Sequence, residues 1–106
     1  MFHQDYSDAE LEQIVEEAML YMCACPGQVA SEIRRLRELI AYQQSCEQQP
    51  DNESVVHQCI ARHAMQSHAV MEACLSEVLA LEGWDRQTLR MPEGLRMRRD
   101  AVLRGE

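Results

Sequence analysis

The sequence predicts an all-α fold, an antiparallel bundle of three long helices followed by a C-terminal extension. Only 5% of its 106 residues are aromatic, and the chain contains four glycines and three prolines. A β-rich fold requires more aromatic and β-branched strands and more turn residues than this. Apolar residues instead recur at spacings of three and four along three stretches, which is typical of amphipathic helices.

The first helix is expected over residues 7–23. Ser7 and Glu10 form a capping-box pattern, which marks a helix start because each side chain can bind the other residue's backbone N–H. Apolar residues follow at helical spacing: Leu11, Val15, Ala18 and Met22. Pro26 and Gly27 end this helix, and a proline there suits the first turn of the next one.

The second helix is expected over residues 27–47 and the third over residues 53–82, with a polar break between them. At about 1.5 Å per residue the third helix is roughly 45 Å long, against roughly 25 to 30 Å for the other two. Its apolar stripe is the longest: Val56, Ile60, Ala64, Ser67, Met71, Cys74, Leu75, Val78 and Leu81. We expect core positions at Ile33, Leu36 and Ile60, and Gly83 as the C-cap.

Residues 1–83 form the predicted bundle domain, and residues 84–106 form a basic extension that docks on the bundle or on a partner. Residues 95–104 could add a short fourth helix. Trp84 either folds over the end of the bundle or anchors an interface.

Charge and composition exclude several classes of function. A net charge of −8 argues against tight binding to nucleic acid or to an anionic membrane. No apolar run approaches the length of a membrane span, and the first residues do not resemble a signal peptide. We therefore expect a cytoplasmic protein with reduced cysteines. Lysine is absent, which excludes lysine-nucleophile chemistry.

Three helices of this size bury little core, and the third is longer than its neighbours. Self-association would cover the remainder, so we expect a homodimer. No catalytic motif is present, and the leading hypothesis is a non-enzymatic protein that acts in protein–protein interaction or assembly with an unidentified partner. The expected contact residues are Trp84, Met65, Arg96, Arg98 and Arg99.

Cysteine and histidine support an alternative, a small metal-binding or redox-responsive protein. An antiparallel hairpin places Cys23, Cys25 and Cys74 at one end of the bundle. Cys59 and His63 are four residues apart, so they project from one helix face and could bind one ion such as Zn(II) or Cu(I). A helix N-terminus favours a thiolate, which makes Cys25 the expected reactive cysteine. Core filling is the default role of all these cysteines.

The segment Tyr21–Gly27, with Cys23 and Cys25 before a helix, resembles the C-x-C start of the bacterioferritin-associated ferredoxin type. The resemblance covers about fifteen residues and implies a 2Fe–2S cluster held by this pair and a later C-x-x-C pair. Cys59 lies at about the right distance, but Arg62 stands where the fourth thiolate belongs. An iron–sulfur cluster is therefore not expected.

The third helix also carries His68 and Glu72, one helical turn apart on the edge of its apolar stripe. Such a pair can bind a metal ion or be sensitive to pH. An ordinary hydrogen bond is the default role of a histidine at such a boundary.

Overall fold

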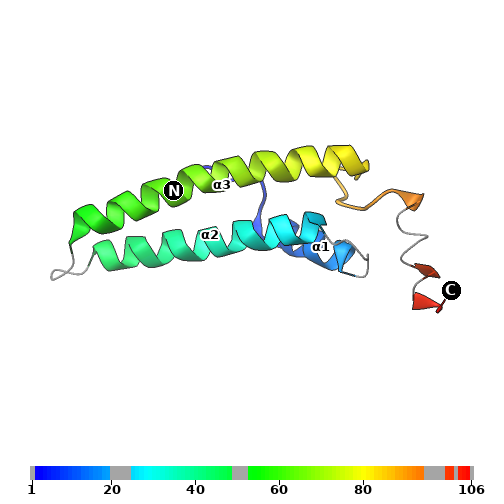
Figure 1. Cartoon of the computed structure of the whole chain (residues 1–106), viewed down its shortest axis with the longest axis horizontal. Coiled ribbons are helices and arrows are strands. Elements are labelled where there is room, and N and C mark those ends of the chain that lie inside the picture. The colour runs from blue at the N-terminus through cyan, green and yellow to red at the C-terminus, as the bar shows by residue number, and fades with distance from the viewer. Residues whose placement is uncertain (1, 20–24, 49–52, 95–99, 102, 106) are drawn as a thin grey trace.

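The computed structural model describes residues 2–19, 25–48, 53–94, 100–101 and 103–105. It contains three helices, α1 (Asp8–Ala18), α2 (Cys25–Glu47) and α3 (Ser54–Glu82). Helix α2 packs against both α1 and α3, and α2 and α3 run side by side as a long antiparallel hairpin (Figure 1). The prediction of an all-α bundle is confirmed.

The expected helix ends follow from local chemistry. Ser7 and Glu10 form the capping box at the start of α1, with hydrogen bonds of 3.0 and 2.9 Å. Gly83 closes α3 in the left-handed region at φ 76°, which glycine adopts without the steric penalty of a side chain. Helix α1 ends at Ala18, earlier than the predicted residue 23, and residues 20–24 lie outside the description.

The main core gathers α1, the first half of α2, the last half of α3 and the segment that follows it. Its fully buried members are led by Tyr6, Leu11, Ile14, Ile33 and Leu75. Trp84, Leu89 and Met91 belong to the same core. Residues 84–91 therefore pack against the bundle through these three side chains. The predicted helix over residues 95–104 falls mostly outside the described residues.

The buried line of α3 shares only Ala64 and Leu75 with the predicted stripe. Val56 and Ile60 are 46% and 36% exposed, and Leu81 is also exposed. The buried residues are instead Ala61, Ala64, His68, Glu72, Leu75 and Leu79. The prediction that Ile60 is a core residue is therefore wrong. Sequence patterns count polar residues as outward-facing, whereas His68 and Glu72 face α2 because Arg37 binds them both.

Helix α1 has 11 residues and α3 has 29, which correspond to about 16 Å and about 43 Å. Figure 1 shows α1 beside only one end of the hairpin. The other end, residues 39–47 and 54–66, consists of two helices, and we call it the distal arm. The molecule is correspondingly elongated, with extents of 59 × 24 × 18 Å.

Candidate functional site

A cluster of three charged or titratable side chains lies inside the hairpin where α1 begins. His68 and Glu72 are each 1% exposed, and the Arg37 side chain is 10% exposed. The Arg37 Nε donates to His68 Nε2 at 2.9 Å, and its Nη2 donates to Glu72 Oε2 at 3.2 Å. A buried arginine and carboxylate require each other, because either one alone would be an uncompensated charge.

The same cluster holds the N-terminal segment, residues 2–7, which we call the strap. The backbone N–H groups of Asp5 and Tyr6 donate to Glu72 Oε2 at 2.9 and 3.1 Å. The Arg37 Nη2 also donates to the Tyr6 carbonyl at 2.6 Å. Figure 1 shows the strap crossing between α3 and α1. One carboxylate and one guanidinium therefore fix the backbone that leads into α1.

Side chains add further contacts along the strap. The Tyr6 hydroxyl lies 2.7 Å from the Ser76 hydroxyl, and the Arg86 guanidinium stacks 4.1 Å from the centre of the Tyr6 ring. Arg86 also donates to the Asp5 carbonyl and pairs with Glu10. The segment after α3 thus also contacts the strap and the start of α1.

Burial within the cluster favours the neutral form of His68. Burial lowers the pKa of His68 by penalising the imidazolium; nearby Glu72 opposes this effect and nearby Arg37 adds to it. The hydrogen bond from Arg37 Nε requires an unprotonated Nε2, so the ring proton belongs on Nδ1, which faces Glu72 Oε1 at 3.6 Å. His68 therefore acts as a hydrogen-bond acceptor for the guanidinium.

Sequence reasoning identified the His68 and Glu72 pair but missed Arg37 and the strap. The signal for burial was present, because residues 61, 64, 68, 72, 75 and 79 form one line at helical spacing. Two polar residues within a line of alanine and leucine indicate a buried polar network. The partners come from positions 31 to 67 residues away, which local patterns do not reveal.

The predicted cysteine sites are only partly assembled. Cys25 is the first residue of α2 and Cys74 lies on α3, both half-buried, while Cys23 falls outside the described residues. The four described cysteines are thiols. Within the described part of the chain, no three His, Cys, Asp or Glu side chains come close enough to hold a metal ion.

Cys59 and His63 do lie together, on the exposed side of the distal arm. The His63 Nδ1 is 3.7 Å from Cys59 Sγ and 2.8 Å from the Cys59 carbonyl oxygen. The imidazole nitrogen nearest the thiol thus already contacts the backbone. Arg62, which stands at the second position of the expected C-x-x-C pair, lies on the same continuous helix.

The predicted interface residues have different environments. Trp84 is 7% exposed, and its indole N–H donates to Glu82 at 2.9 Å. Met65 is half-buried and lines a groove on the distal arm with Ala61 and Ala69. The three arginines Arg96, Arg98 and Arg99 lie outside the described residues.

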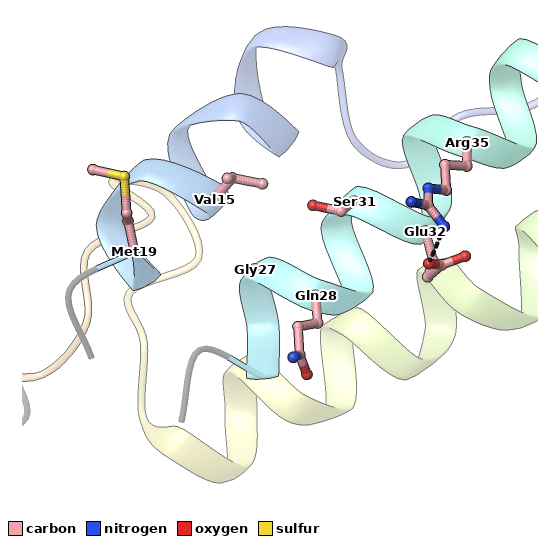
Figure 2. Close-up of a pocket in the computed structure, with 7 residues that line it drawn as sticks. All are labelled: Val15, Met19, Gly27, Gln28, Ser31, Glu32 and Arg35. Atoms are coloured by element: carbon pink, nitrogen blue, oxygen red, sulfur yellow. Dashed lines mark hydrogen bonds and ion pairs between the residues drawn. The ribbon is translucent and has the colours of Figure 1, made fainter. Parts of the chain in front are cut away.

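A second groove, of about 650 Å³, lies between the end of α1 and the start of α2 (Figure 2). Val15 and Met19 line it from α1, and Gly27 from α2. The two charged residues at its edge, Glu32 and Arg35, pair with each other at 3.3 Å. The groove thus shows no buried catalytic group of the kind that an active site needs.

The hairpin leaves one long apolar edge uncovered. On α3, Glu72 and Ser76 mark the side that meets the strap. Successive residues of a helix are 100° apart, so the exposed residues of the predicted α3 stripe lie on the side of the buried line that faces away from the strap. We call this surface the open face, and it comprises Leu36, Leu39, Val56, Ile60, Met71, Cys74 and Val78. All seven residues are half-buried or exposed, and none carries a charge.

Comparison with known proteins finds no matching family model, curated protein or solved structure. The resemblance to the ferredoxin type therefore gains no support from a family match. In the described part of the chain, no helix is sufficiently long and apolar to span a membrane.

Proposed function

We propose that this protein is an interaction or assembly module that works as a homodimer, in which two copies pack through their open faces. The observation that carries the proposal is the apolar edge of the α2–α3 hairpin, which has no charged member along α3 and continues past the start of α1. A helix edge of this kind in a single chain is incompletely covered, and a second helical layer would complete a bundle.

The size of the open face suits a dimer. Val56 and Val78 are 22 residues apart, or about 33 Å along α3, and Leu36 and Leu39 add about one turn of α2 beside it. The face therefore offers a second copy a continuous apolar surface along most of one long helix.

The chemistry of the face also favours a second copy as the occupant. The chain carries a net charge of −8, yet the part of the open face on α3 has no charged member. Two like-charged copies repel each other at long range, so they associate most readily through a surface free of that charge. A basic partner attracted by the acidic chain would instead meet charged residues elsewhere.

Sedimentation velocity of the untagged protein tests the proposal. We expect a species of twice the chain mass of 12.2 kDa. The affinity of dimerisation should increase with salt concentration, because salt screens the repulsion between copies. Ile60→Glu and Val56→Glu should weaken dimerisation by roughly a hundredfold, because each places two like charges in a symmetric interface. A monomer at all salt concentrations would refute the proposal.

Val55→Glu is the matched control. Val55 is adjacent to Val56 and more exposed, at 77%, but it points about 100° away from the open face. The control should dimerise as the wild type does. Equal weakening by Val55→Glu and Val56→Glu would show that added charge, rather than the open face, controls association.

Native mass spectrometry of the same protein tests the alternative function. One Zn(II) or Cu(I) ion per chain would favour a metal-binding role. The next variants would then be Cys25→Ser and Cys59→Ser.

A further inference from the structure

We propose that the strap is an acid-released latch: protonation of His68 breaks its contact with Arg37 and frees residues 2–7 from α3. The inference goes beyond dimerisation and uses the opposite side of the hairpin. It rests on the way a single buried cluster supports both the strap and the start of α1.

Arg37 is the centre of the latch. Its guanidinium donates to His68 Nε2, to the Tyr6 carbonyl, to Glu72 Oε2 and to Asp8 Oδ1. These acceptors come from α3, the strap and α1. A guanidinium is planar and its N–H donors have fixed directions. Movement of the group away from one acceptor therefore also changes its hydrogen bonds to the other acceptors. Loss of the His68 contact therefore disturbs the bond to the Tyr6 carbonyl.

Protonation of His68 reverses the sign of its contact with Arg37. The added proton must go to Nε2, because the hydrogen bond from Arg37 requires that nitrogen to be the bare one. Two cationic N–H groups would then face each other across 2.9 Å, in a site with little water to screen them. The imidazolium also attracts Glu72, 3.6 Å from Nδ1.

Glu72 would consequently be drawn away from the strap. Its Oε2 accepts both strap N–H groups, from Asp5 and Tyr6. The ring of Phe2 meets the His68 ring edge to face, with centroids 4.7 Å apart. The His68 ring and the strap thus touch directly, and reorientation of the ring disturbs Phe2 as well.

The charged groups around His68 come from every element packed against it. Glu72 lies on the same helix, Arg37 on α2, Asp8 at the start of α1 and Asp5 on the strap, where it pairs with His3. His3 is a second histidine on the strap, so the experiment must separate its effect from that of His68.

Release of the strap would lengthen an existing groove. The groove lined by Ala61, Met65 and Ala69 lies on the same edge of α3 as Glu72 and Ser76, by helical spacing. The strap covers the continuation of that edge. An open latch would join the two stretches into one groove along α3.

Amide hydrogen exchange measured by NMR on the whole untagged chain tests the latch. The reporters are the Asp5 and Tyr6 amides, which bind Glu72 directly. Protection factors correct for the intrinsic pH dependence of exchange. From about pH 7.5 to about pH 5 we expect protection of both amides to fall at least about tenfold in the wild type. A pKa of His68 that is one unit higher in the released state than in the latched state produces a change of this size.

His68→Gln isolates the proposed trigger. The amide oxygen of glutamine can accept from Arg37 but does not titrate, so protection in this variant should change less than about twofold over the same range. His3→Gln and His63→Gln are controls that should behave as the wild type does. A fall in protection that survives His68→Gln, or that disappears in His3→Gln, would overturn the proposal.

Glu72→Gln provides a second test that does not depend on the stability of the His68 variant. It removes the carboxylate charge that pairs with Arg37 while keeping nearly the same shape. Protection of the Asp5 and Tyr6 amides should then be low at both pH values. Full protection at both would show that Glu72 does not hold the strap. The oligomeric state, measured in parallel, tests the homodimer separately.

Discussion

The two ends of the hairpin are stabilised differently. At the proximal end, α1, the strap and residues 84–91 surround α2 and α3 with buried apolar residues and a buried ion pair. In the distal arm, the hydrogen bonds between the helices include His57 to Gln43 at 2.6 Å and Gln58 to Glu47 at 2.7 Å. The proximal end is a three-layered core, whereas the distal arm is two helices with few large buried side chains.

The difference indicates where stability and binding reside. Large buried side chains supply most of the free energy of folding, so the proximal end should dominate the stability of the monomer. The distal arm keeps apolar side chains at its surface, which is typical of an interaction surface. The proximal end thus holds most of the buried core, whereas the distal arm has the more exposed apolar surface.

The largest expected effect comes from breaking the proximal ion pair. Arg37→Met would leave the Glu72 carboxylate buried without its cation, and we expect the free energy of unfolding to fall by about 3–5 kcal/mol. Urea denaturation followed by circular dichroism measures it. In the distal arm, Gln43→Met removes a neutral hydrogen bond, which should cost only about 1–2 kcal/mol. Equal losses would remove the contrast between the two ends.

Truncation of matched isoleucines sharpens the comparison. Ile33 is fully buried at the proximal end, whereas Ile60 is 36% exposed. Ile33→Ala should lower the free energy of unfolding by about 2–5 kcal/mol, as for buried core residues. Ile60→Ala should cost less than about 1 kcal/mol in the monomer, because its removal leaves little cavity. Measurement at a concentration below the dimer's dissociation constant keeps the interface out of the comparison.

The smallest expected effect is on global stability as a function of pH. Burial depresses the pKa of His68 below its ordinary 6.5, so the unfolded chain takes up a proton before the folded chain does. The stabilisation that results from keeping His68 neutral is present above about pH 6.5. It is lost as the pH falls toward the pKa that His68 has in the folded chain. Urea midpoints at several pH values should decline in that window for the wild type and stay flat for His68→Gln.

A separate loss follows at lower pH. Hydrogen bonds from the backbone of Ser7 hold the pKa of Glu10 below its ordinary 4.5, and hydrogen bonds from the backbone of Thr88 and Gln87 do the same for Asp85. Carboxylates of this kind stabilise the folded chain when the pH is above their ordinary pKa values, and this stabilisation is lost once they are protonated. A decline confined to this lower range would show that His68 contributes nothing.

The sequence by itself determined the helical class, the α1 capping box, the glycine that ends α3 and the antiparallel order of α2 and α3. Each of these depends on residues close together in the chain or on a short connection, which local spacing encodes. The same local reasoning identified His68 and Glu72 as a pair and Trp84 as a residue that could fold over the bundle.

Only the tertiary structure decided which edge of α3 is buried. The apolar spacing favoured the line through Val56 and Ile60, but Arg37 of α2 binds His68 and Glu72 and turns the neighbouring edge inward. The strap likewise depends on bonds between residues 66 and 67 positions apart. A single sequence does not encode such distant pairings locally, because their free energy exists only once the helices have packed.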